Sequence, residues 1–286
     1  MAPILPCGSR SLDLSTPRVM GILNITPDSF SDGGELYRDN RVDVDAVLRR
    51  AESMLQEGAD ILDIGGESTR PGAAKVSESE ELDRVTVAVQ AVSERFDTVI
   101  SVDTSNPKVM SESAHLGAGL LNDVRGFARE GALEVAAASG LAMCVMHMQG
   151  QPDTMQANPA YVDVIADING YFEERLQALS LAGVAMERVV LDPGFGFGKT
   201  AEHNFVMLAR LRELAYQDLP LLVGLSRKSM ITSVLDRSPE ERLFASVALA
   251  TMAVERGARI VRVHDVGATT DALAMWYRMS QSSGHE

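Results

Sequence analysis

Polar and charged side chains recur in this sequence at the ends of short apolar runs. There are eight such runs, and each ends in, or is followed by, a group that can hydrogen-bond or carry charge: Asn24, Asp63, Asp103, Asn122, His147, Asp192, Ser226 with Lys228, and Arg262 with His264. Randomly scattered surface polarity would not be phased with the apolar runs in this way. If the runs are parallel strands, their C-terminal ends share one face, and these side chains converge on a single site.

The residue types at these ends predict the kind of ligand. Asp103, Asn122 and Asp192 offer acceptor and donor edges. Such edges suit a flat, nitrogen-rich heterocycle, because a ligand without matching groups would leave buried polar atoms unpaired. A second set is basic and comes from different strand ends: Arg70, Lys228, Arg262 and His264. This set suits a phosphorylated or diphosphate group, so one substrate carrying both features fits the inventory.

The segment Asn24–Gly34 follows the apolar run Val19–Leu23 and is polar, ends in glycine and contains two acids. A loop of this composition after a buried strand is typical of a binding loop. We expect Asp28, inside it, to contribute to metal or diphosphate binding.

Two nucleotide motifs are excluded by spacing. Gly194–Thr200 resembles a phosphate loop, but Pro193 stands where its first glycine would be, and Lys199 replaces the third glycine of a dinucleotide fingerprint. The five histidines show no His-x-x-x-His pair, so zinc is not expected. Magnesium stays open, because it prefers oxygen ligands and substrate phosphates and leaves little trace in a sequence.

The elements that position these residues alternate along the chain. The apolar runs predict strands at 19–25, 61–64, 99–102, 120–121, 142–146, 189–191, 221–225 and 260–263. Helical periodicity predicts helices at 46–56, 82–92, 162–181, 205–214 and 244–255. Such alternation indicates a parallel sheet, and eight strands without a Pro- or Ser-rich linker favour a closed (β/α)8 TIM barrel.

Helix boundaries can also be predicted. Ser77 with Glu80 and Ser238 with Glu241 have capping-box spacing, and Pro107 suits a first helical position. Glycines follow the helical runs where left-handed stops are common: Gly58, Gly117, Gly140, Gly183 and Gly257.

Bulk properties limit the class of protein. The chain has 286 residues, 45% of them hydrophobic, and a net charge of −14, which argues against nucleic-acid binding. Its two cysteines, Cys7 in an expected N-terminal tail and Cys144 in an expected strand, form no disulfide framework or metal motif, which suits the cytoplasm. We expect no signal peptide or membrane span. We expect an N-terminal extension at 1–17, one barrel domain at 18–280 and a tail at 281–286.

Several independent motifs, in order, resemble those of the dihydropteroate synthase family. They run from Met20 to the final helix: Asn24–Gly34, Asp63–Gly72, Ser101–Thr104, Leu121–Val124, Met146–Gly150, Asp192–Lys199, Ser226–Ser229 and Arg262–Val266. The resemblance implies a (β/α)8 barrel that condenses 4-aminobenzoate with 6-hydroxymethyl-7,8-dihydropterin diphosphate. The products are 7,8-dihydropteroate and diphosphate, on the way to folate.

The resemblance also implies residue roles. The pterin would be held by Asp103, Asn122, Met146, Asp192 and Lys228. The diphosphate would be held by Asn24, Thr69, Arg262 and His264, with Asn24 also near Mg2+. The aminobenzoate would be bordered by Arg70, Pro71, Phe197 and Ser226. Asp103, Lys228, Arg262 and His264 would act in catalysis, loops near 26–37 and 66–75 would close over the site, and the enzyme would be a sulfonamide-sensitive homodimer.

Three other functions remain open from the sequence. A pterin-binding methyltransferase domain shares the barrel and the pterin acids, but would not need the 26–34 loop or the Ser226–Ser229 cluster. A non-catalytic paralogue is disfavoured by the complete diphosphate and aminobenzoate positions. A Schiff-base aldolase using Lys228 would be revealed by borohydride trapping.

Overall fold

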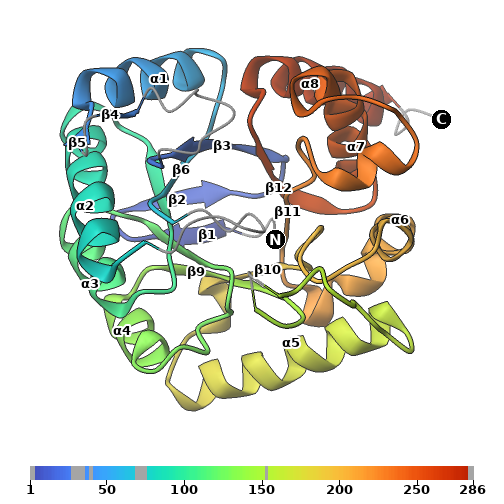
Figure 1. The fold of residues 1–286 in the computed structure, drawn as a ribbon, viewed down its shortest axis with the longest axis horizontal. Coiled ribbons are helices and arrows are strands. Elements are labelled where there is room, and N and C mark those ends of the chain that lie inside the picture. The colour runs from blue at the N-terminus through green and yellow to red at the C-terminus, as the bar shows by residue number, and fades with distance from the viewer. Residues whose placement is uncertain (1–3, 27–35, 39–40, 68–75, 152–153, 283–286) are drawn as a thin grey trace.

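The computed structural model describes residues 4–26, 36–38, 41–67, 76–151 and 154–282. Within these residues, parallel strands form one closed barrel in the order β3-β6-β7-β8-β9-β10-β11-β12 (Figure 1). The barrel strands are β3 (Arg18–Asn24), β6 (Ile61–Gly65), β7 (Val99–Asp103), β8 (Leu120–Asp123), β9 (Ala142–Met146), β10 (Val189–Asp192), β11 (Leu221–Val223) and β12 (Ala258–Val263). The predicted (β/α)8 barrel is confirmed.

A helix follows each barrel strand, and the helices form a ring around the sheet (Figure 1). They are α1 (Val44–Gln56), α2 (Glu78–Arg95), α3 (Pro107–His115), α4 (Ala132–Ser139), α5 (Val164–Leu181), α6 (Ala201–Ala209), α7 (Leu243–Glu255) and α8 (Val266–Ser282). No described helix is both long and apolar enough to cross a bilayer.

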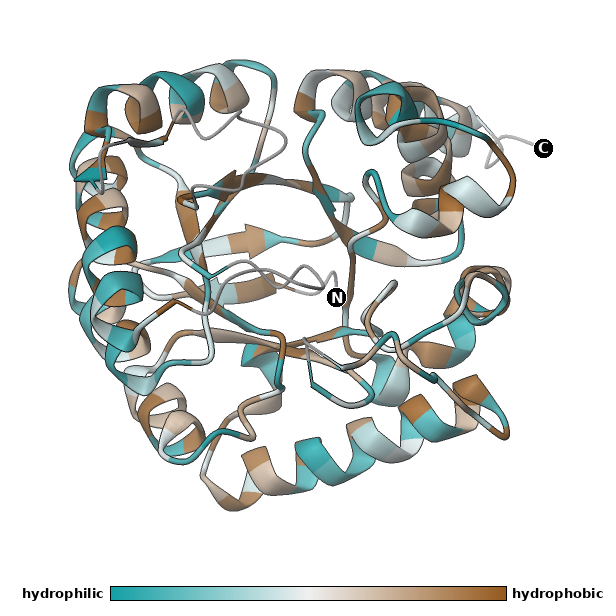
Figure 2. Cartoon of the chain, viewed as in Figure 1, coloured by the Kyte–Doolittle hydropathy of each residue, from teal (hydrophilic) through white to brown (hydrophobic). Residues whose placement is uncertain are grey.

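The barrel strands are largely apolar (Figure 2), because helices cover their outer face while their inner face fills the barrel. Leu62 and Ile64 of β6 lie in the core formed with the helices. Ile61 faces the barrel interior, and Asp63, two residues later, faces it one layer higher. The two-residue period thus separates each strand into a helix-facing and an interior set.

The N-terminal segment closes one end of the barrel. An antiparallel hairpin of β1 (Ile4–Cys7) and β2 (Arg10–Asp13) lies across the ring (Figure 1). Leu5, Cys7 and Leu12, with Leu14 just beyond, pack on the interior residues at the N-terminal ends of the strands. Cys7 is 2% exposed, so its assignment to a tail was wrong: it lies in the hairpin and is buried against the barrel interior.

Most predicted boundaries are confirmed. Ser77 caps α2 with its Glu80 partner, and Pro107 begins α3. The helix predicted at 205–214 was misplaced: α6 begins at Ala201 because Thr200 caps it, and the chain tightens into a 3₁₀ turn at Leu211–Leu214. The Ser238–Glu241 box caps a 3₁₀ helix, Pro239–Arg242, directly before α7. Short 3₁₀ helices also precede β10, at Met186–Arg188, and β11, at Tyr216–Asp218, and another lies at Ser229–Ser233. A small hairpin pairs β4 (Tyr37–Arg38) with β5 (Arg41–Val42).

Candidate active site

The C-terminal end of the barrel holds an arginine between two carboxylates. Arg262 of β12 donates from Nε to Asp63 Oδ2 at 2.6 Å and from Nη2 to Asp103 Oδ2 at 3.0 Å. Asp63 is fully buried and also accepts from Ser101 Oγ at 2.6 Å. The register of β6 against β7 places Asp63 beside Ser101. These contacts join β6, β7 and β12 across the barrel.

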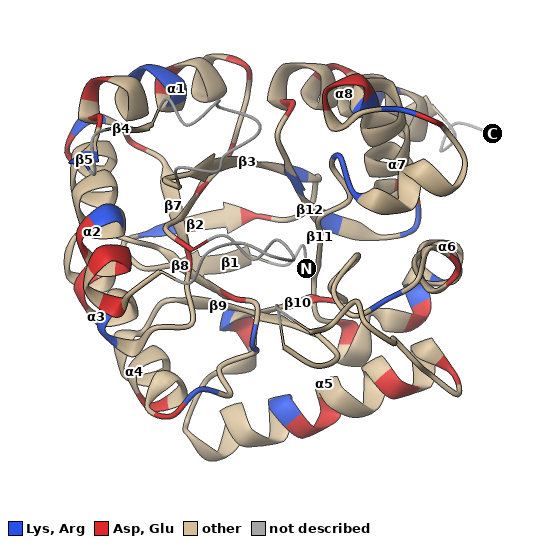
Figure 3. Cartoon of the chain, in the orientation of Figure 1, with Lys and Arg blue, Asp and Glu red and all other residues tan. Residues whose placement is uncertain are grey.

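The buried charges shift one another's pKa. Burial alone would lower the pKa of Arg262, but Asp63 and Asp103 raise it above its usual value, so the guanidinium stays charged. Burial raises the pKa of Asp103, and Arg262 opposes this rise. Charges of both signs lie on the barrel ring as well as on the outer helices (Figure 3). Asp103 therefore sits where added positive charge nearby would favour its ionised form.

Two strand ends on either side of β9 offer acceptors to a ligand. Asn122 of β8 is 3% exposed, and its buried Oδ1 has no hydrogen-bond partner among the described residues. Asp192 ends β10, and its Oδ1 accepts from the backbone N–H of Gly194 at 2.8 Å. Burial raises the pKa of Asp192. An unpaired buried carbonyl is costly, so the Asn122 amide is typical of a position that a ligand donor completes.

Lys228, in the segment after β11, faces Phe197, in the segment after β10. The Lys228 ammonium lies 4.2 Å from the centre of the Phe197 ring, a cation–π contact. A Cβ at Gly196 would lie 3.1 Å from Lys228 Cδ, so the glycine lets the 194–198 turn pass close to the lysine stem. Burial, followed by the charge of Arg262, lowers the pKa of Lys228 to about 8.

Ser226 and His264 meet at the next pair of strand ends. Ser226 Oγ lies 3.0 Å from His264 Nδ1 and accepts from the His264 backbone N–H at 3.2 Å. Beside them, Arg227 donates two hydrogen bonds to Asp265, at 3.1 and 2.6 Å. Arg227 has a φ of 58°, a left-handed conformation rare for its type, which this bidentate pair helps to hold. The segments after β11 and β12 are thereby fixed to each other.

Asn24 completes the ring of strand ends. It ends β3 and pairs in register with Gly65 of β6. A Cβ at Gly65 would lie 3.4 Å from Asp103 Cβ and 3.7 Å from Asn24 Oδ1. The glycine thus lets Asn24 and Asp103 approach the same space.

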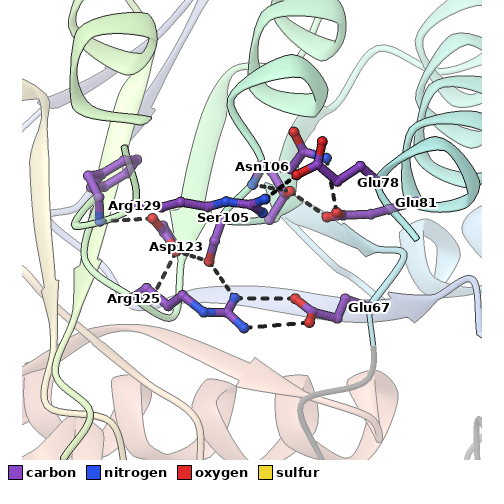
Figure 4. A network of polar contacts seen from close by, with 10 residues as sticks. Glu67, Glu78, Glu81, Ser105, Asn106, Asp123, Arg125 and Arg129 are labelled. Atoms are coloured by element: carbon purple, nitrogen blue, oxygen red, sulfur yellow. Dashed lines mark hydrogen bonds and ion pairs between the residues drawn. The ribbon is translucent and has the colours of Figure 1, made fainter. Parts of the chain in front are cut away.

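A polar network that was not predicted from the sequence lies beside the site (Figure 4). Asp123 accepts from Ser105 Oγ, and Arg125 donates to Ser105 Oγ at 2.8 Å and to Glu67 at 3.2 Å. Asp123 also accepts from the backbone N–H groups of Arg125 and Phe127, at 2.9 and 2.8 Å. The network ties together the ends of β6, β7 and β8. A signal existed, because Asp123 follows Asn122, but it was assigned no role.

Met146 and His147 lie at the end of β9, 3% and 6% exposed. The His147 ring contacts Lys199 Nζ at 2.9 Å, and burial, with the Lys199 charge, lowers the pKa of His147 to about 3. Three other predicted site residues, Thr69, Arg70 and Pro71, lie outside the described residues, as does Asp28. The remaining predicted residues all stand at or directly after the C-terminal strand ends.

Comparisons with known proteins show the family of this chain. The family model of pterin binding enzymes matches residues 20–264. The dihydropteroate synthase of Escherichia coli (strain K12) is 56% identical over 263 residues, 92% of each chain, and that of Haemophilus influenzae is 50% identical over 95% of this chain and 97% of its own. Among solved structures, a Yersinia pestis dihydropteroate synthase in a sulfonamide drug complex superposes with a TM-score of 0.93 at 51% identity, covering 97% of this chain and 99% of that one.

A Burkholderia cenocepacia dihydropteroate synthase complexed with 7,8-dihydropteroate matches with a TM-score of 0.88 at 46% identity, over 99% of this chain and 98% of that one. The fold and the residues at its C-terminal end define a pterin-binding enzyme built on a (β/α)8 barrel. More narrowly, the chain belongs to the dihydropteroate synthase family, transferases that join a pterinylmethyl group to 4-aminobenzoate.

Proposed function

We propose that the C-terminal end of this barrel carries out that condensation, using 6-hydroxymethyl-7,8-dihydropterin diphosphate and releasing 7,8-dihydropteroate and diphosphate. The buried Oδ1 of Asn122, which has no hydrogen-bond partner among the described residues, carries the assignment, because it lies in a ring of acceptors and donors that a pterin would complete. Asn122 Oδ1 and the Asp192 carboxylate accept from the amino and ring N–H groups of the pterin. Lys228 donates to the ring, and Met146 packs against its face.

The diphosphate binds on the other side of the site. Arg262 uses Nε and Nη2 for Asp63 and Asp103, which leaves Nη1 for a diphosphate oxygen. His264, aligned by Ser226, and Asn24 serve the same group, together with Thr69. Charge that grows on the leaving group as its C–O bond breaks is stabilised by these fixed donors, which is electrostatic catalysis.

The pterinylmethyl cation left behind is delocalised over the ring. Asp103 stabilises it, since its carboxylate is held in place by Arg262 and its ionised form is favoured beside a positive charge. The arylamine is neutral near pH 7 and needs positioning rather than a general base. Phe197, Ser226, Arg70 and Pro71 border it, so a sulfonamide of similar shape competes for the same space.

Magnesium is the proposed cofactor, held by Asn24 and the diphosphate itself. No group of three or more His, Cys, Asp or Glu side chains in the described part of the chain could hold a metal ion. That agrees with an ion that takes most of its ligands from phosphate oxygens and water. Asn24 supplies an amide oxygen, a ligand type that Mg2+ accepts. When bound, the ion would neutralise charge on the leaving group.

We also propose that the enzyme is a homodimer in the cytoplasm. Apolar side chains stand exposed on α7 and α8: Phe244 is 85% exposed, Met252 45% and Met275 73%. A second copy that covers these helices would bury them. Light scattering on wild type and Phe244→Glu tests this, since a monomeric wild type would contradict it.

The cytoplasmic location is supported by the two cysteines. Cys7 and Cys144 are unpaired thiols, which agrees with a reducing compartment.

The direct test of the function is a coupled assay for diphosphate release with both organic substrates and Mg2+, with 4-aminobenzoate omitted as the control. We expect release that requires both substrates, with dihydropteroate identified by mass spectrometry. Pterin binding without turnover would instead favour the methyltransferase or the non-catalytic paralogue. A covalent adduct of Lys228 after borohydride treatment would favour the aldolase.

A further inference from the structure

A buried lysine next to the site, Lys199, has none of the roles proposed above. Lys199 is 3% exposed and directly precedes Thr200, the N-cap of α6. Its Nζ donates to Gly194 O at 2.9 Å, to Phe197 O at 3.0 Å and to His147 O at 3.4 Å, and contacts His147 Nδ1 at 2.9 Å. All four partner atoms are uncharged, since His147 is neutral at this burial.

Such a lysine is costly to bury. A charged ammonium removed from water loses hydration that neutral acceptors replace only in part. Burial accordingly lowers the pKa of Lys199 to about 7, while Asp192 opposes this shift. A smaller apolar residue would avoid the cost if the position served only packing. The retained amine therefore indicates a task that needs its donors.

The contacts show what the amine holds. The carbonyls that it contacts belong to both ends of the 194–197 turn and to His147, directly after β9, so one atom links the end of β9 to the turn that follows β10. Phe197, whose carbonyl it holds, places its ring over Lys228 Nζ. Gly194, whose carbonyl it also holds, gives its N–H to Asp192. The 194–197 turn thus contacts Asp192 and Lys228, two proposed ligand-binding side chains, and Lys199 holds the carbonyls at both of its ends.

We propose that Lys199 is a positioning residue for the arylamine: it braces the Gly194–Phe197 turn against His147 and thereby holds the Phe197 ring as the wall of the aminobenzoate subsite. This inference rests on the proposed function, because it gives Phe197 that wall. Lys199 acts through Phe197 and touches neither substrate. Losing its donors would release the wall while leaving the pterin contacts of Asn122 on β8 in place.

The experiment compares Lys199→Met, which keeps the stem and removes the donors, with Lys108→Met, which removes an exposed lysine at the start of α3. Steady-state kinetics are measured for each substrate. We expect Lys199→Met to raise KM for 4-aminobenzoate by about 10-fold or more, with KM for the pterin diphosphate changed by less than about 3-fold. Lys108→Met should match wild type. Equal changes in both KM values, or none, would overturn the proposal.

A double-mutant cycle with Phe197→Ala tests the route of the effect. If Lys199 acts through Phe197, adding Lys199→Met to Phe197→Ala should raise KM for 4-aminobenzoate by less than about 2-fold further, whereas independent effects would multiply and contradict the route. If Lys199→Met does not fold, Lys199→Leu, which also lacks a donor, replaces it in both experiments with the same expected one-sided change. A wild type that forms no dihydropteroate would refute the proposed function itself; an active wild type with unaltered Lys199 variants would refute only this inference.

Discussion

The two ends of the barrel are filled by the same strands but with opposite chemistry. At the N-terminal end, Ile61 of β6 and Ile260 of β12 face the interior and pack under Leu14. Two residues further along these strands, Asp63 and Arg262 face the interior and form an ion pair at 2.6 Å. One step of the two-residue period thus changes the interior from apolar to charged.

The difference shows how stability and chemistry are divided. The N-terminal end, closed by the β1–β2 hairpin, buries apolar side chains, which is the main favourable term in folding. The C-terminal end buries carboxylates, a guanidinium and an amide carbonyl without a described partner, all of which cost stability unless paired. Substitutions at the C-terminal end should therefore change turnover, whereas substitutions at the N-terminal end should change stability and leave turnover nearly constant. The expected effect on turnover is largest at Arg262 and smallest at Leu14.

The largest effect is expected for Arg262→Met. It removes a donor to the leaving group and leaves Asp63 and Asp103 without their cation, so kcat/KM should fall by about 100-fold or more. The free energy of unfolding should also fall, by about 3 kcal/mol, because buried carboxylates lose their partner. Kinetics and urea unfolding check both. Arg256→Met, at a half-buried position directly after α7, is the matched control, and an Arg262→Met enzyme as active as that control would contradict the comparison.

A smaller effect is expected for Asn122→Leu. The change removes the proposed acceptor for the pterin, so KM for the pterin diphosphate should rise by about 10-fold. Stability should change by less than about 1 kcal/mol, because a buried carbonyl without a described partner is removed together with the weak 3.5 Å hydrogen bond from Asn122 Nδ2 to Asp63 Oδ2. Thermal unfolding and kinetics are measured on the same preparation. A loss of stability with an unchanged KM would mean that Asn122 serves the core rather than the ligand.

The pH dependence gives a further, graded test at Lys228. Its pKa of about 8 means that the amine is protonated and able to serve as a cationic donor below pH 8 and loses its charge as the pH rises through that value. We expect kcat/KM for the pterin diphosphate to fall by up to about 10-fold per pH unit above 8. Lys228→Arg, which stays charged, should remove this decline while lowering activity overall. The same decline in that variant would assign it to another group.

The smallest effect on turnover is expected at the opposite end. Leu14→Ala opens space under the barrel, where Leu14 is fully buried, and should lower the free energy of unfolding by about 3 kcal/mol. Both KM values and kcat should stay within about 2-fold of wild type below the melting temperature. Ile4→Ala, on the same hairpin but 61% exposed, is the control and should change neither. A kcat loss in Leu14→Ala would show that the two ends are coupled.

Local patterns in the sequence predicted the barrel well. Apolar runs gave all eight strands, and capping residues such as Ser77 and Pro107 gave helix starts, because these signals act over a few residues. The hairpin of residues 4–13 was not predicted, since Leu5 and Cys7 are buried only by strands far along the chain. The start of α6 was missed because a histidine, His203, takes the capping-box position usually held by Glu or Gln.

The sequence predicted where the site residues stand in the barrel, but it did not predict which of their side chains contact one another. Phasing of polar residues with strand ends placed Asp103, Asn122 and Asp192 at one face of the barrel. Sequence spacing could not show that Arg262 lies between Asp63 and Asp103, because that arrangement depends on barrel closure across β3. Nor could it show that Lys199, in a segment that resembles a phosphate loop, turns inward to hold carbonyl groups.

The central claim is that the charged end of the barrel receives a pterin on Asn122 and Asp192. A crystal structure of the wild-type protein with 6-hydroxymethyl-7,8-dihydropterin diphosphate tests it most directly. We predict the ring N–H and amino groups within hydrogen-bond distance of Asn122 Oδ1 and the Asp192 carboxylate, and the diphosphate against Arg262 and His264. A pterin bound elsewhere, with Asn122 Oδ1 still unpaired, would contradict the account.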